Sequence, residues 1–142
     1  MVLVDSSIWI EAARRQGDLE AKVSLEALLE EYEAATTSPV LLEVLGGARK
    51  EDRQRMRGYF DVIPHVLVDA KDWDHAVEFA WQLKDKGHSL PWNDVLIASV
   101  AIRRDLRVYA QDKHFEVMAA ASGLRLYRPG YGGTYVHEET GG

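Results

Sequence analysis

MVLVDSSIWI, residues 1–10, is the stretch of sequence that decides the fold. Its apolar run Val2-Leu3-Val4 is too short for a helix and rich in β-branched residues, which indicates a buried strand. Asp5 follows at once, and two serines follow Asp5. Asp5 is either an ordinary strand-end residue or a carboxylate held at the carboxyl edge of a parallel sheet, where open α/β folds bind their ligands. The rest of the chain bears on this choice.

Strand-like runs alternate with helical patterns along the chain. Further strands are expected in AATTSPV (34–40), at Val66–Val68, in LRVYAQ (106–111) and in LRLYRP (124–129). Helices are expected at residues 7–15, 19–34, 38–45 with Ser38 as N-cap, 50–60, 72–86 with Gly87 as cap, 91–105 and 112–122. Strands separated by helices need crossover connections, which predicts a three-layer α/β/α domain with a central parallel sheet of about five strands.

Length and composition are typical of one domain. The 142 residues are 46% hydrophobic, enough for a single core, and we assign residues 1–129 to it. The Gly-rich tail, residues 130–142, is expected to be flexible. The absence of cysteine fits a reducing compartment. No signal peptide or membrane-spanning stretch is visible, so we expect a cytoplasmic protein.

The formal net charge of −6 argues against a general polyanion-binding coat. Divalent cations bound by several acids would nevertheless reverse the charge locally. An RNA substrate is therefore compatible with the acidic composition.

Three acids occupy the ends of the expected elements, Asp5, Asp94 and Asp112, and a fourth, Glu43, lies inside the helix that follows the second strand. Each has an ordinary explanation as well. Asp112 would cap the following helix, and Asp94 would favour the positive end of its helix. Glu43 lies within the apolar run VLLEVL (40–45), where an unpaired buried charge would cost several kcal/mol, so it needs a metal or a salt bridge such as one to Arg49.

Taken together, the four acids favour a metal site. Clustered carboxylates repel one another and are commonly stabilised by hard divalent cations such as Mg²⁺ or Mn²⁺. Zinc is less favoured, because no two histidines have ligand spacing on one helix face.

Four segments carry a family resemblance: VLVDSSIWIE (2–11), SPVLLEVLGGAR (38–49), PWNDVLIASVAI (91–102) and VYAQDKHFEVMAAASGLRLY (108–127). In this order and spacing they resemble the PIN-domain ribonucleases, especially toxins of the VapC type from toxin–antitoxin pairs. The resemblance implies that Asp5, Glu43, Asp94 and Asp112 form an acidic site for Mg²⁺ or Mn²⁺. It implies supporting polar roles for Ser6 or Ser7 and for Asn93, although serine and asparagine also cap helices.

The resemblance also implies metal-dependent cleavage of RNA, a cognate antitoxin and a homodimer. Gln111 and His114 depart from the family pattern, since many members carry a small hydroxyl residue and some carry an acid at these places. Their roles stay open. Five basic residues are candidate phosphate contacts, with a solvated surface as the alternative: Arg14, Arg15, Arg49, Lys50 and Arg53. For Ile8, Trp9 and Leu28, core packing competes with a role in partner binding.

Two alternatives share parts of this pattern. A PIN nuclease of RNA maturation would have the same chemistry and another partner, and a short neighbouring reading frame for an antitoxin would separate the two. A catalytically silent α/β binding module would lack the cleavage. A receiver-like phospho-acceptor domain fits poorly, because it needs paired acids where this chain has Asp5-Ser6-Ser7.

Overall fold

The computed structural model describes residues 1–138, and its centre is a parallel sheet with the strand order β3-β2-β1-β4. The strands are β1 (Val2–Val4), β2 (Ala34–Thr37), β3 (His65–Val66) and β4 (Arg107–Tyr109). Leu3 of β1 lies between Ala35 of β2 and Val108 of β4. The segment 124–129, expected as a further strand, contributes one parallel bridge from Leu126 to Val108. The parallel α/β/α architecture is confirmed, with four strands and this bridge in residues 1–138.

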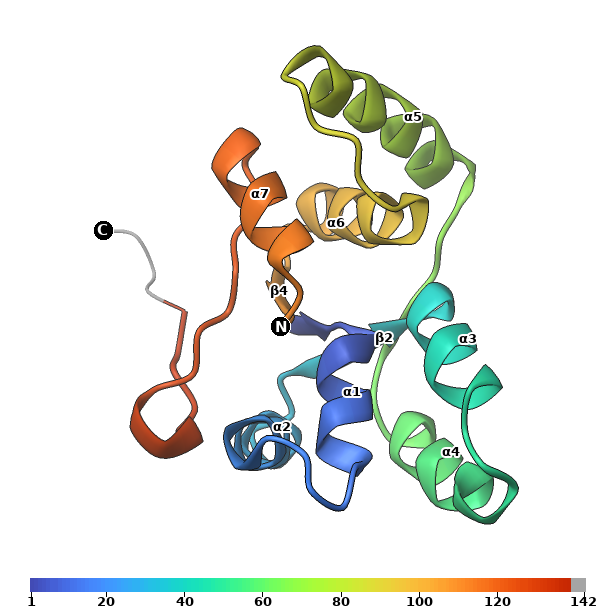
Figure 1. The fold of residues 1–142 in the computed structure, drawn as a ribbon, viewed down its shortest axis with the longest axis vertical. Helices are drawn as coiled ribbons and strands as arrows, with labels where there is room; N and C mark the ends of the chain where they lie inside the picture. The colour runs from blue at the N-terminus through green and yellow to red at the C-terminus, as the bar shows by residue number, and fades with distance from the viewer. Residues whose placement is uncertain (139–142) are drawn as a thin grey trace.

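Helices cover both faces of the sheet (Figure 1). In this view α1 (Ser6–Ala13), α2 (Leu19–Glu30) and α4 (Arg53–Asp61) lie on one side of the strands. The other side carries α5 (Ala70–Asp85), α6 (Trp92–Arg104) and α7 (Lys113–Ala121). Helix α3 (Ser38–Gly46) follows β2, and two short 3₁₀ helices, η1 (Lys50–Asp52) and η2 (Tyr131–Gly133), complete the described chain.

Helix boundaries follow local capping chemistry, with one correction. Ser38 is the first residue of α3 and not its N-cap; Thr37 takes that place without a side-chain hydrogen bond. The reason is that Thr37 still belongs to β2 and keeps an extended backbone, so the strand runs directly into the helix. Gly87 follows α5 with φ +87°, as expected of a glycine after a helix C-terminus.

The strand β1 is the centre of the core. Val2, Leu3 and Val4 are fully buried, as a strand covered on both faces requires. Ile8 and Leu28 are fully buried too, and the Trp9 ring packs 4.5 Å from that of Phe60. These three residues of α1 and α2 therefore pack in the core. Within residues 1–138, no helix is both long and apolar enough to cross a membrane.

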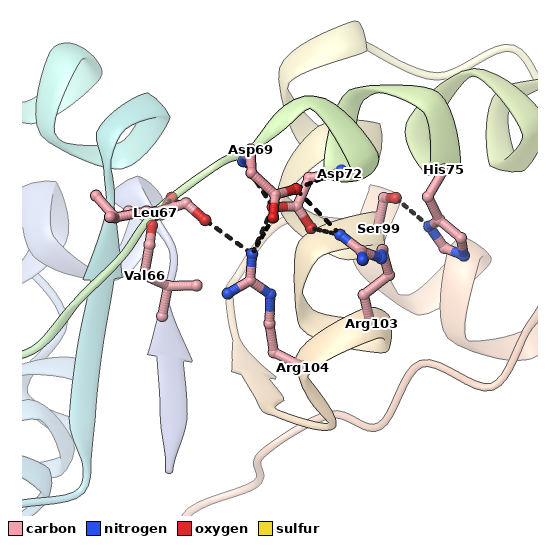
Figure 2. A network of polar contacts seen from close by, with 9 residues as sticks. Val66, Leu67, Asp69, Asp72, His75, Ser99, Arg103 and Arg104 are labelled. Atoms are coloured by element: carbon pink, nitrogen blue, oxygen red, sulfur yellow. Dashed lines mark hydrogen bonds and ion pairs between the residues drawn. The ribbon is translucent and has the colours of Figure 1, made fainter.

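An ion-pair network joins α5 to α6 (Figure 2). The side chain of Asp72 is fully buried and receives hydrogen bonds from Arg103 and, at 2.6 Å, from Arg104. Asp69 caps α5 by accepting from the Asp72 backbone N–H at 2.9 Å, and it also pairs with Arg103. Arg104 donates further to the carbonyl of Leu67, which ties the network to the segment after β3.

The described part of the C-terminal segment contacts the domain. The Arg107 guanidinium donates to the Val136 carbonyl at 3.2 Å, and the rings of Tyr127 and Tyr135 stack. Gly133 is buried beside Ser24 of α2. Residues 139–142 of the expected 130–142 tail lie outside the described residues.

Candidate metal centre

The strand order places a crevice between β1 and β4. After β1 the chain builds β2 and β3 on one side and later returns to place β4 on the other side of β1. Such a reversal opens a binding crevice at the carboxyl ends of the two diverging strands. Asp5 directly follows β1 and Asp112 lies three residues after β4, so both fall at this crevice.

Asp5 is buried with one carboxylate oxygen unpaired. Its side chain is held by Ser7, whose backbone N–H and hydroxyl donate to Oδ2 at 3.1 and 2.7 Å. The Gln111 backbone N–H in turn donates to the Ser7 hydroxyl at 3.1 Å, which connects β1 to the loop after β4. Oδ1 is buried and has no hydrogen-bond partner among residues 1–138. Burial raises the pKa of Asp5 above its ordinary value despite the Ser7 hydrogen bonds, and the charges of Asp94 and Glu43 raise it further.

Asp94, Asp112 and His114 converge at the same crevice. Each offers one ligand atom, and these atoms all lie within 4.8 Å of one another. His114 Nδ1 lies 2.9 Å from Asp94 Oδ2 and 3.0 Å from Asp112 Oδ1. The Asp94 hydrogen bond raises the pKa of His114 above its ordinary value, and both neighbouring carboxylates add to this. Burial raises the pKa of Asp94, and the charges of Asp112 and Glu43 act in the same direction.

Glu43 reaches the site from the exposed side of α3. Val40 and Val44 point into the core, while Glu43 is exposed, so the expectation that it is a buried charge among apolar neighbours is wrong. The helical repeat explains this, because Val40 and Val44 share one face and Glu43 lies on the next. The Ser6 hydroxyl donates to Glu43 Oε2 at 2.7 Å, and the Asn93 amide donates to Oε1.

The alternative partner suggested for Glu43 is engaged elsewhere. The Arg49 guanidinium pairs with Glu51 and Asp52, at 3.8 and 3.3 Å. Glu43 is therefore held by Ser6 and Asn93, which lie on the two elements that also position Asp5 and Asp94.

The residues present fit a hard divalent cation. Carboxylate oxygens are the ligands that Mg²⁺ and Mn²⁺ prefer, and a bound cation would satisfy the unpaired Oδ1 of Asp5 and offset the mutual repulsion of the acids. Asp94 and Asp112 are the two acids that the geometry groups directly, with His114 as the third member. Glu43 lies near enough for its charge to raise the pKa of both Asp5 and Asp94, and the charge of Asp94 also raises the pKa of Asp5.

His114 is the member of this group to which the sequence assigned no role. Its position in the sequence, two residues after Asp112 and in the first turn of α7, could have indicated a role in the site. The backbone N–H of His114 donates to Asp112 at 2.9 Å. This turn directs the imidazole toward Asp94. Gln111 contributes its backbone to Ser7, while its side chain donates to Asp18, the N-cap of α2, at 2.8 Å.

Comparisons with known proteins identify the family of the chain. The family model described as PIN domain matches residues 2–121. VapC ribonuclease Mb1587 of Mycobacterium bovis is 32% identical over 130 residues, which covers 88% of this chain and 96% of that protein. Ribonuclease VapC11 of Mycobacterium tuberculosis matches with the same identity and coverage.

Solved structures share the fold. FitAcB from Neisseria gonorrhoeae superposes with a TM-score of 0.73 at 17% identity, covering 90% of this chain and 97% of that chain. VapBC-5 from Mycobacterium tuberculosis, a member of the VapBC family of toxin-antitoxin systems, superposes with a TM-score of 0.62 at 26% identity, covering 89% and 96%. The match over most of the length, in sequence and in fold, shows that the chain belongs to the PIN-domain family, as a homologue of the VapC ribonucleases.

Proposed function

We propose that this protein is the toxin of a toxin–antitoxin pair and cleaves RNA with the help of Mg²⁺ or Mn²⁺. The observation that carries the proposal is the convergence of Asp94 and Asp112 beside the buried, half-unpaired carboxylate of Asp5. The curated relatives named above are ribonucleases of the VapC type, which supports the same activity here.

In this proposal Asp5, Glu43, Asp94 and Asp112 are the metal ligands and the acids on which catalysis depends. A bound Mg²⁺ or Mn²⁺ would supply an activated water and compensate the charge of the scissile phosphodiester. Ser7 fixes the orientation of Asp5, and Ser6 and Asn93 fix that of Glu43. These hydrogen bonds hold the acids in place before substrate arrives, so that little reorganisation is needed during cleavage.

A groove between α1, α2 and α4 is suited to the antitoxin. Its cavity of about 580 Å³ has an apolar floor that includes Trp9, Leu25 and Met56. Its rim carries five basic residues: Arg14, Arg15, Lys22, Arg49 and Arg55. An amphipathic helix with acidic residues along its edges is complementary to such a groove. The Klebsiella pneumoniae structure with a TM-score of 0.66 and 24% identity is a toxin-antitoxin complex, which supports a partner of this kind.

The proposal is tested by RNA cleavage with metal and residue controls. We expect the purified protein to cut structured RNA in Mg²⁺ or Mn²⁺ and to lose this activity in EDTA. Asp5→Asn and Asp94→Asn should lose it as well, whereas Asp74→Asn, which removes an exposed acid from α5, should retain it. Cleavage that persists in EDTA, or that is undiminished in both site variants, would contradict the proposed metal-dependent mechanism.

A further inference from the structure

A second cavity, of about 520 Å³, lies beside Glu43 between the end of α1 and the turn from α3 into α4. Its wall includes Glu43 together with Arg14, Arg15 and Arg49. We propose that these three arginines bind backbone phosphates of the RNA strand at a distance from the scissile bond. This inference rests on the proposed function and assigns the strand a path away from the metal centre.

The three arginines also belong to the rim of the groove proposed for the antitoxin, and when no antitoxin is bound there they are available for RNA. Arg14 and Arg49 have side chains that are 65% and 78% exposed, and their ion pairs with Glu11 and Asp52, at 3.3 Å each, lie at the solvent-exposed surface. Exposed pairs of this kind contribute little and exchange readily. Arg15 makes no ion pair with any residue of the described chain, 1–138. The cavity lining holds three arginines against two acids, Glu43 and Asp52, in a protein whose net charge is −6.

Glu43 belongs both to the wall of this cavity and to the candidate metal centre. It accepts hydrogen bonds from Ser6 and Asn93, next to Asp5 and Asp94. Asp5 stands before the first residue of α1 and Arg14 after its last, a separation of about 13 Å at the rise of 1.5 Å per residue. When the scissile phosphate of an RNA strand lies at the four acids, phosphates a few nucleotides further along that RNA would therefore lie beside the arginines.

The shape and chemistry of the cavity favour a phosphate backbone. Gly47 and Ala48 leave part of the wall without bulky side chains, so a polymer backbone can approach closely. Arginine binds phosphate in a bidentate manner and stays charged at any physiological pH. Lys50 and Arg53, the other two candidate phosphate contacts, do not line this cavity, and Arg53 donates to the Ala48 carbonyl.

The test measures RNA binding apart from cleavage. A labelled single-stranded RNA of twelve nucleotides is titrated with wild-type protein in EDTA over a series of salt concentrations, and fluorescence anisotropy reports Kd. We expect Arg15→Gln and Arg49→Gln each to weaken binding several-fold. Each should also reduce the slope of log K against log salt by about 0.7, the value for one lost contact to single-stranded nucleic acid. Arg128→Gln removes an equally exposed arginine paired with Glu116 and should leave both quantities unchanged.

Cleavage kinetics provide the second readout. In Mn²⁺ the two variants should raise KM for a long RNA with little change in kcat, and the effect should vanish for a substrate too short to reach from the acids to Arg14. Wild-type binding and salt slope in both variants, with melting curves that show intact folding, would overturn the inference. So would unchanged RNA binding combined with weaker binding of an acidic peptide. Failure of the proposed function is distinct, because it would abolish cleavage in the wild type while the binding measurement could still succeed.

Discussion

Asp5 combines burial with neighbouring negative charge. Its pKa lies above the ordinary value because of burial and because of Asp94 and Glu43. The folded protein therefore binds more protons than the unfolded chain between the unfolded and folded pKa values. Without metal, stability falls as the pH rises through this window and stays lower above it.

We predict that Asp5→Asn raises the melting temperature at pH 7 in EDTA by roughly 2–4 °C, the shift that ~1 kcal/mol produces in a domain of this size. Asparagine keeps the N-cap of α1, so the helix start is preserved. Scanning calorimetry with and without Mn²⁺ checks this, with exposed Asp74→Asn as control. Mn²⁺ should stabilise the wild type more than Asp5→Asn. A lower melting temperature for Asp5→Asn than for the wild type in EDTA would show that the charged Asp5 carboxylate does not destabilise the metal-free protein.

The sequence made the individual site residues partly predictable. Asp5 and Asp112 follow short strands, and the parallel topology requires such residues to meet at one edge. The exposure of Glu43 was not predictable from the apolar letters around it, because which helix face meets the core depends on packing partners far away in sequence. The role of His114 required the distance to Asp94, twenty residues away.

At the scale of elements, Asp72 holds α5 and α6 together. Burial acts to raise its pKa, but hydrogen bonds from the Asp69 backbone, Arg103 and Arg104 outweigh burial, so the pKa lies below its ordinary value of 3.8. A depressed carboxylate pKa stabilises the folded state above pH 3.8, and this stabilisation is lost as the pH falls through the folded-state value. The network should therefore contribute at neutral pH and disappear in strong acid.

We predict that Asp72→Asn lowers the free energy of unfolding at pH 7 by about 3 kcal/mol, since it leaves two arginines without their buried partner. Urea denaturation between pH 2 and pH 7 measures this, and the difference from wild type should shrink toward the acid end. Asp74→Asn on the same helix, at an exposed position, is the matched control. A difference that stays constant with pH would exclude the carboxylate as its source.

The boundaries of α2 and α3 depend on long-range contacts as well as on the local sequence. Ser38-Pro39 correctly marked the start of α3, yet the N-cap shifted to Thr37 because β2 pairs through that residue with Val66. Helix α2 ends at Glu30, four residues before the end predicted from the sequence, because residues 34–37 join the sheet. In both cases strand pairing, a long-range contact, overrides local helix preference.

At the scale of the whole molecule, Gly133 lets the C-terminal segment pack on α2. Its φ is +90°, and an added Cβ would lie 3.0 Å from a Val23 methyl group and 3.1 Å from the Ser24 backbone. We predict that Gly133→Ala costs about 1–2 kcal/mol of stability and exposes residues 128–138 to limited proteolysis. Gly123→Ala, where an added Cβ meets no atom within 4 Å, should change neither property. Unchanged protease resistance in Gly133→Ala would show that this packing is not needed to hold the segment.

The face formed by α5 and α6 exposes three of the four tryptophans in the chain. Trp73, Trp81 and Trp92 are 56%, 63% and 69% exposed and border a mostly apolar cavity of about 330 Å³. Exposed apolar patches of this kind mark interaction sites, and tryptophan is enriched in protein interfaces. We propose that the homodimer implied by the family resemblance buries this face against a second copy of the chain.

We predict that the protein is a dimer and that Trp81→Glu converts it into a monomer, because the substitution places a charge on the apolar face, and truncation of a central interface aromatic residue alone costs about 2 kcal/mol or more. Light scattering after size-exclusion chromatography, over a range of protein concentrations, measures the mass. Tyr131→Glu is the control, since Tyr131 is 99% exposed and lies in η2, outside the α5–α6 face. A monomeric wild type, or a dimer that survives Trp81→Glu, would assign this face to another partner.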